Sequence, residues 1–181
     1  MEEIIKILKR KGVIVFPTDT VYGLLADYSF EEAVNKVYKI KKRDKKPLPI
    51  FVKDIKMAEQ LALINKKQKA FLEKIWPGKI TVILNRKNSS ETIALRMPDY
   101  PLLNQLLKKY NKPLTGTSAN ISGKGSLTKI KEVRKQIKQA DLIVDVGDLP
   151  DSFPSTIISL INYKIIRKGA DYERLKNIQF N

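Results

Sequence analysis

The chain has 181 residues, of which 43% are hydrophobic and 30% are charged, and its formal net charge is +16. This length suits one sizeable domain, and the composition is that of an ordinary globular protein. The sequence contains no cysteine and no histidine, which excludes disulfides, thiol nucleophiles, cysteine-based zinc sites and histidine-based catalytic triads. Any chemistry must therefore use Lys, Arg, Asp, Glu, Ser, Thr or Tyr side chains, backbone amides or a bound metal.

The positive charge favours a polyanionic partner, such as nucleic acid, a nucleotide or an anionic membrane. Only seven of the 35 basic residues are arginine, and lysines scattered over most segments equally suit a surface selected for solubility. No apolar run approaches the roughly 20 residues needed to cross a bilayer. The acidic N-terminal stretch does not have the pattern of a signal peptide, so we expect a cytoplasmic protein with no membrane partner.

Hydrophobic spacing in the first half of the chain predicts alternating helices and strands. Ser29, followed by Glu32 three residues later, has the pattern of a helix-capping box. The spacing predicts strands over residues 13–17 and 47–52, and helices over residues 1–12, 29–42, 54–64 and 66–76.

The second half continues the alternation. We expect strands within residues 76–86, 92–98 and 112–118, and helices over 100–110 and 129–140, the latter capped by Thr128. Three short β-segments, 141–147, 155–160 and 163–169, then precede a helical tail, and the last two form a predicted hairpin. Interleaved strands and helices with a hairpin predict an α/β fold with a mixed sheet, and we expect residues 1–181 to be a single domain.

Polar side chains gather where predicted strands end. Thr18, Asp19, Thr20 and Tyr22 follow the first strand, and Arg96 ends a later one. Ligands of open α/β sheets bind outside the carboxyl ends of strands. Each group alone also fits a capped turn or a solvated surface, but arginines, lysines and hydroxyls at several strand ends suit phosphate and carboxylate binding.

The stretch "TGTSANISGKGSLT", residues 115–128, invites comparison with a phosphate-binding Walker A loop. That loop requires four residues between its glycines and a hydroxyl after its lysine. Here six residues separate Gly116 from Gly123, and Gly125 follows Lys124. On its residues alone, the stretch is either another kind of nucleotide loop or a polar turn between a strand and a helix.

Six motifs in order resemble those of the YrdC/TsaC-type threonylcarbamoyl-AMP synthases, from about Gly12 to Gly169. They are "FPTDTVYGL", "KKRDKKPL", "WPGKITVIL", "ALRMPDYP", "TSANISGKGSLT" and "PSTIISL". The resemblance implies a single YrdC-like domain: an open, twisted mixed sheet with flanking helices and a concave basic surface. It also implies a nucleotidyltransferase that joins L-threonine, bicarbonate or CO₂ and ATP, with Mg²⁺, into threonylcarbamoyl-AMP and pyrophosphate. This is the first step towards N6-threonylcarbamoyladenosine (t6A) at position 37 of certain tRNAs.

The same resemblance implies two sets of site residues and no protein nucleophile. The threonine-binding set is Thr20, Arg96, Gly116 and Ser155. The ATP-binding set is Lys41, Arg43, Lys46, Thr92, Ser118, Asn120, Ser126 and Arg167, with no metal ligand assigned to the protein.

The chain departs from the family pattern in several places. The spacing from Arg43 to Lys46 is one residue short, Phe51 stands where many relatives have histidine, and "TGTSAN" replaces "APSAN". The C-terminal domain of longer relatives has no counterpart, so the chain resembles the short form.

Two other functions remain open from the sequence. A non-catalytic RNA-binding module would explain the charge but not the threonine-sized polar contacts. Carbamoyl-adenylate formation in hydrogenase maturation uses a similar domain, normally within a much longer chain. The expected partners of the synthase are its three substrates and downstream threonylcarbamoyl transferase proteins, with tRNA as a candidate for direct binding.

Overall fold

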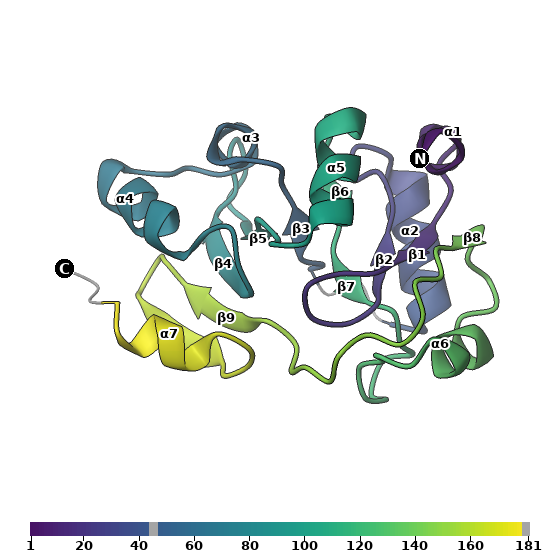
Figure 1. The fold of residues 1–181 in the computed structure, drawn as a ribbon. Helices are drawn as coiled ribbons and strands as arrows, with labels where there is room; N and C mark the ends of the chain where they lie inside the picture. Colours follow the sequence, from purple (N-terminus) through teal and green to yellow (C-terminus); the bar gives the residue numbers. More distant parts are fainter. Residues whose placement is uncertain (44–46, 179–181) are drawn as a thin grey trace.

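The computed structural model describes residues 1–43 and 47–178 and confirms the α/β class (Figure 1). The described helices are α1 (Glu2–Lys9), α2 (Glu31–Lys41), α3 (Ile55–Leu61), α4 (Lys66–Ile75), α5 (Pro101–Tyr110), α6 (Ile130–Gln136) and α7 (Tyr172–Lys176). The described strands are β1 (Ile14–Phe16), β2 (Gly23–Leu25), β3 (Ile50–Phe51), β4 (Ile80–Asn85), β5 (Thr92–Arg96), β6 (Leu114–Thr115), β7 (Thr117–Ser118), β8 (Leu142–Ile143), β9 (Thr156–Ser159) and β10 (Lys164–Arg167).

The strands form two mixed sheets with a shared border. One has four strands in the order β7-β2-β1-β8, and the other has six in the order β10-β9-β4-β5-β3-β6. The predicted hairpin is confirmed, since β9 and β10 pair antiparallel. Strands β8 and β9 pair parallel with β1 and β4, so late segments of the chain return to strands formed much earlier.

The two sheets meet at Thr115 and Gly116. The buried Thr115 receives a hydrogen bond on Oγ1 from the Ala26 backbone N–H at 2.9 Å, and its own N–H donates to the Ala26 carbonyl at 2.9 Å. The chain then passes from β6 to β7 through Gly116, where an added Cβ would lie 2.9 Å from the Phe51 ring. A glycine is required here because any side chain would collide with that buried aromatic ring.

The sequence missed strand β2 and two details of helix capping. β2 follows the turn at Thr18 directly and is only three residues long, so it has no alternation to detect. Ser29 does not cap α2: its Oγ donates to the buried Asp27 at 2.6 Å, and Phe30 precedes the helix without a side-chain cap. A nearby carboxylate out-competes the helix terminus for the hydroxyl because charge-assisted hydrogen bonds are stronger.

Thr128 does not cap α6 either. Its hydroxyl donates to Asp151 at 3.2 Å, and the Asp148 carboxylate accepts the Ile130 N–H at 3.0 Å instead. The helix ends at Gln136, short of the predicted residue 140. A capping box does occur at α4, where Asn65 and Gln68 bind each other's backbone N–H.

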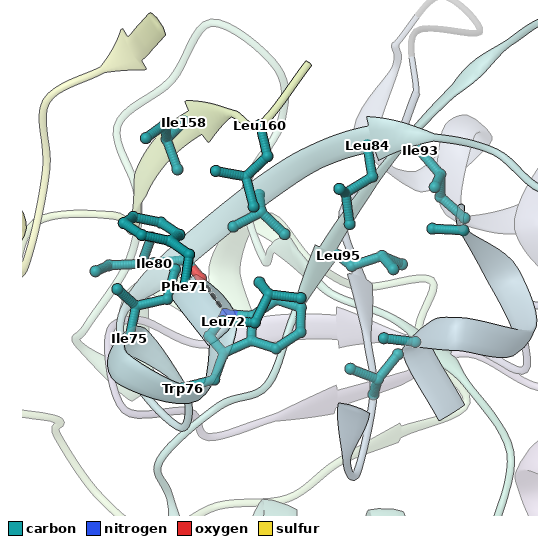
Figure 2. Packing of buried hydrophobic residues seen from close by; sticks show 14 of the residues in the cluster. Phe71, Leu72, Ile75, Trp76, Ile80, Leu84, Ile93, Leu95, Ile158 and Leu160 are labelled. Atoms are coloured by element: carbon teal, nitrogen blue, oxygen red, sulfur yellow. Dashed lines mark hydrogen bonds between the residues drawn. The ribbon is translucent and has the colours of Figure 1, made fainter. Parts of the chain in front are cut away.

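Side chains of the six-stranded sheet point alternately to two faces, of which one is covered by helices and the other is open. Side chains at 80, 82 and 84 in β4, and at 93 and 95 in β5, pack with helices α3 and α4 in one buried apolar cluster (Figure 2). Within it, the Trp76 Nε1–H donates to the Ile80 carbonyl at 2.8 Å. Successive side chains of a strand point to opposite faces, so residues 81, 83, 92, 94 and 96 face away from this cluster. Among the described residues, no helix is long and apolar enough to cross a membrane.

Candidate functional site

A cavity of about 350 Å³ opens on the face of the six-stranded sheet away from α3 and α4. Its walls combine cationic, hydroxyl and apolar groups: Thr20, Val21, Arg43, Pro47, Pro49, Ile83, Thr92, Ala94, Arg96, Gly116, Thr117, Ser118, Pro154, Ser155, Ile157, Ile166 and Arg167. An adjoining hollow of about 390 Å³ is lined by Lys41, Lys42, Arg43, Ser118, Asn120, Ser122 and Gly123. The two spaces share Arg43 and Ser118, so they form one elongated site.

Arg96 forms an enclosed part of the wall. Its side chain is 5% exposed, and its guanidinium donates from Nε to the Gly78 carbonyl at 3.0 Å and from Nη1 to Thr20 Oγ1 at 3.3 Å. Nη2 donates to the Asp19 carboxylate at 2.6 Å. Burial lowers the pKa of Arg96 and the Asp19 charge raises it, so the carboxylate offsets the loss of water around the cation.

Arg96 also lies beside the buried Phe51. Its Cζ is 5.8 Å from the centre of the Phe51 ring, close enough for a cation–π interaction. The same ring packs beneath Gly116. Phe51 therefore supports the cavity wall from behind and does not line the cavity.

Ser155 lies at the start of β9 between a hydroxyl and a guanidinium. Its Oγ is 2.8 Å from Oγ1 of the buried Thr81, and Arg167 donates to its carbonyl from Nε at 3.2 Å and from Nη2 at 2.7 Å. Partial burial, followed by the charge of Arg96, lowers the pKa of Arg167. Two arginines close enough to influence each other mark this wall as a site for an anion.

Lys41 organises the loop that follows β7. Its Nζ donates to the Ser118 carbonyl at 2.5 Å, the Asn120 carbonyl at 2.9 Å and Asn120 Oδ1 at 3.2 Å. Ser118 Oγ donates to the same Oδ1 at 2.5 Å. An ammonium has three N–H groups, so all of them face the protein. Burial, and then the neighbouring Arg43, lower the pKa of Lys41 to about 8.

Arg43 reaches the site because α2 ends just before it. The last helical residue is Lys41, and Lys42 adopts a left-handed conformation with φ of 48°. That turn takes Arg43 off the helix axis and into the wall of both hollows. Its described hydrogen bond, from Nη2 to the Pro47 carbonyl, is long at 3.4 Å.

Most of the predicted site residues line this space. The main cavity is lined by Thr20, Arg43, Thr92, Arg96, Gly116, Ser118, Ser155 and Arg167, and the adjoining hollow adds Lys41 and Asn120. Ser126 is half-buried and lines neither, and Lys46 lies outside the described residues.

Sequence reasoning left Asp19 and Thr81 out of the predicted site. Asp19 holds Arg96, and Thr81 contacts Ser155. Thr81 could have been suspected from the sequence, because it places a hydroxyl within the otherwise apolar run of "ITVIL".

A hollow lined by arginines and hydroxyls on the open face of a mixed sheet has the chemistry of a site for small carboxylate and phosphate ligands. The chain belongs to the Sua5/YciO/YrdC family, whose model, described as "Telomere recombination", matches residues 6–169.

Similar proteins cover most of this chain. A protein of Methanocaldococcus jannaschii, provisionally named a threonylcarbamoyl-AMP synthase, is 38% identical over 93% of this chain and 87% of its own length. The threonylcarbamoyl-AMP synthase of Bacillus subtilis is 36% identical over 84% of this chain and 48% of its own length.

Solved structures agree in fold. Sua5 of P. abyssi complexed with L-threonine has a TM-score of 0.86 at 29% identity, over 92% of this chain and 53% of that protein. YciO of E. coli has a TM-score of 0.85 at 24% identity, over 93% of this chain and 88% of that protein, and supports the fold. The chain thus spans about half the length of the B. subtilis and P. abyssi proteins.

Proposed function

We propose that this chain is an L-threonylcarbamoyladenylate synthase, which condenses L-threonine, bicarbonate or CO₂ and ATP into threonylcarbamoyl-AMP and pyrophosphate. The observation that carries the proposal is one continuous site with Arg96, Thr20 and Ser155 at one end. Arg43 and Ser118 continue it into the adjoining hollow. Related proteins named threonylcarbamoyl-AMP synthase, and the L-threonine bound to P. abyssi Sua5, support this choice of substrates.

The amino acid would bind at the Arg96 end. A guanidinium has five N–H groups, and three of those on Arg96 are used by Gly78, Thr20 and Asp19. One N–H remains on each terminal nitrogen, which suits the two oxygens of a carboxylate. Thr20 and Ser155 are residues less than 10% exposed, and their hydroxyls would orient the rest of a threonine-sized ligand.

ATP would bind along Arg43, Ser118 and Arg167, with its phosphates towards the hollow beside Lys41. Among the described residues, no cluster of three Asp, Glu, His or Cys side chains offers a metal site. The two oxygens of Asp19 are also taken, by Arg96 and by the Asp99 N–H. We therefore propose that Mg²⁺ arrives as the Mg–ATP substrate, held by the triphosphate rather than by carboxylates of the protein.

The chemistry needs no nucleophile from the protein. The threonine amino group and CO₂ form a carbamate, and a carbamate oxygen attacks the α-phosphorus of ATP as pyrophosphate leaves. The attacking group is already an anion, so the protein has to bring the substrates together and balance the phosphate charge. Fixed orientation and preorganised cations supply both effects.

The product would then pass to threonylcarbamoyl transferase proteins that modify adenosine 37 of tRNA. We propose that the reaction takes place in the cytoplasm and that residues 1–181 work as a single domain. The net charge of +16 supports direct, mainly electrostatic tRNA binding as part of this proposal.

A substrate-omission assay tests the function. The purified chain with Mg–ATP should release pyrophosphate only when both L-threonine and bicarbonate are present, and mass spectrometry should detect threonylcarbamoyl-AMP. Replacing L-threonine by L-valine, which has a methyl group in place of the hydroxyl, is the matched control and should lower the rate. Equal pyrophosphate release without threonine contradicts the proposal, and RNA binding without any release would favour the non-catalytic module.

A further inference from the structure

Asp19 and Arg96 form an unusual ion pair in this chain. Their side chains are 4% and 5% exposed, and the Nη2–Oδ1 distance is 2.6 Å. Among the described residues, this is the one ion pair in which both side chains are almost fully buried. A buried pair is weak evidence for stability, because withdrawing both charges from water costs about as much as their attraction returns. The pair is therefore better explained by a role of Asp19 in holding the geometry of the Arg96 guanidinium.

The second carboxylate oxygen of Asp19 ties the pair to another loop. Oδ2 accepts the backbone N–H of Asp99 at 3.0 Å. Asp99 follows β5 closely, whereas Asp19 follows β1, so one side chain joins loops from two different sheets. Each oxygen of Asp19 has a defined donor, and the carboxylate cannot rotate without losing one of them.

Asp19 and its neighbour Thr20 together fix the Arg96 fork. Asp19 binds Nη2, Thr20 binds Nη1, and the Gly78 carbonyl binds Nε. Arg96 lines the cavity while Asp19 does not. Asp19 thus acts from behind the guanidinium, and the remaining N–H groups are left for a ligand.

The charges around Arg96 also support a role for Asp19 in fixing the guanidinium. Arg167 lines the same cavity and is close enough for the charge of Arg96 to lower its pKa. In the part of the chain that the structure describes, the carboxylates whose charges act on Arg96 are Asp19, in direct contact, and Asp171, without a direct hydrogen bond to it. Removing Asp19 would leave a buried guanidinium facing a second cation, and the guanidinium would shift towards water or towards another acceptor.

We propose that Asp19 is a positioning residue for the carboxylate of the amino-acid substrate, a role that rests on the proposed function. It sets the orientation of the Arg96 guanidinium so that one N–H of each terminal nitrogen meets a carboxylate oxygen. Its replacement should therefore weaken recognition of the carboxylate more than recognition of ATP.

The test compares Asp19→Asn with Asp145→Asn. Asp145 lines neither hollow and is a control with matching contacts, because it also accepts an arginine Nη2, from Arg134 at 2.8 Å, and a backbone N–H, from Gly147 at 2.8 Å. Calorimetry should show the Kd for L-threonine rising about ten- to hundredfold in Asp19→Asn, the range expected for one hydrogen bond to a charged group. The Kd for ATP should change less than about threefold, and Asp145→Asn should match wild type.

A ligand without the carboxylate separates positioning from general damage. Wild type should prefer L-threonine over L-threoninamide, and folded Asp19→Asn should lose most of that preference. The binding measurements are made well below the melting temperature of the variant, because removing one partner of a buried ion pair lowers stability. If Asp19→Asn does not fold, Asp19→Glu keeps the charge but displaces the oxygens by one methylene, and it too should weaken L-threonine binding. Wild-type affinity for L-threonine in a folded variant, or equal losses for L-threonine, L-threoninamide and ATP, would overturn the inference. A wild-type chain that binds no L-threonine would instead overturn the proposed function and this inference with it.

Discussion

The two ends of the elongated site are built differently. At one end, Arg96 is 4% exposed and has a defined acceptor on each of its three nitrogens. At the other end, Arg43 is only half-buried, and among the described residues its side chain makes one hydrogen bond, a long one to the Pro47 carbonyl. The enclosed end combines Arg96, the last residue of β5, with the loop after β1 and with Ser155 just before β9. The open end combines Arg43, which follows α2, with Ser118, the last residue of β7.

This difference indicates how the two proposed substrates would be recognised. A small amino acid offers few atoms, so its site gains from side chains that are already fixed before binding. A triphosphate carries enough charge to order exposed cations itself. We therefore expect the Arg96 end to be preorganised and the Arg43 end to tighten when the nucleotide binds.

The largest expected effect is that of salt on tRNA binding by the exposed lysines, compared with its effect on turnover in the enclosed site. Raising salt from about 50 to 200 mM should weaken tRNA binding by roughly 10³–10⁵, the loss expected for 6–10 phosphate contacts. Threonine-dependent turnover should largely survive, because enclosed charges are screened less than exposed ones. Filter binding and pyrophosphate release, measured on one preparation, check both quantities. Salt-resistant RNA binding combined with salt-sensitive turnover would contradict this prediction.

A smaller effect is expected from Arg96→Lys, which retains the charge but removes the planar fork. Losing one hydrogen bond to a charged group costs about 1.5–3 kcal/mol, so the KM for L-threonine should rise about tenfold or more. The KM for ATP should change little. Steady-state kinetics with each substrate varied provide the measurement, and Arg134→Lys, on the exposed surface of α6, is the control. Unchanged threonine dependence would show that the enclosed arginine is not the carboxylate ligand.

The smallest expected effect is that of Ser118→Ala at the open end. Its hydroxyl binds Asn120 in the loop, and losing it should raise the KM for ATP about threefold to tenfold, within the cost of a neutral hydrogen bond. The melting temperature should hold, because the hydroxyl is only partly buried. Ser29→Ala removes a donor to the buried Asp27. It should therefore lower the melting temperature and leave the KM for ATP unchanged. A sharp fall in melting temperature with unchanged ATP affinity in Ser118→Ala would show that this loop is structural.

The sequence predicted the regular elements well because hydrophobic period is a local property. The strand containing Arg96 and the strand beginning after Ser155 could be placed, and so could the final hairpin. The sequence did not show which strands pair with each other. For example, β9 lies parallel to β4, and this pairing depends on contacts between distant segments. The three-residue β2 has no period to detect.

The structure brings predicted site residues near strand ends, such as Arg96 and Ser155, to one cavity, whereas the contacts that tertiary packing adds could not be predicted from the sequence. Nothing local to Lys41 shows that its ammonium would face the Ser118 and Asn120 carbonyls. Nothing local to Asp19 shows that it would pair with an arginine 77 positions away. Such pairings form only when segments that are distant in the sequence pack together.

The parallel pairing of late strands with early ones has a consequence for synthesis on the ribosome. Strands β8 and β9 pair with β1 and β4, and the cavity also needs Ser155 and Arg167. A nascent chain that has emerged only as far as β7 presents unpaired edges of β1 and β4, which are prone to pair with other chains. Residues up to β10 must leave the exit tunnel before the binding cavity exists, so the speed of translation through the codons for β8, β9 and β10 would set how long those edges stay unprotected.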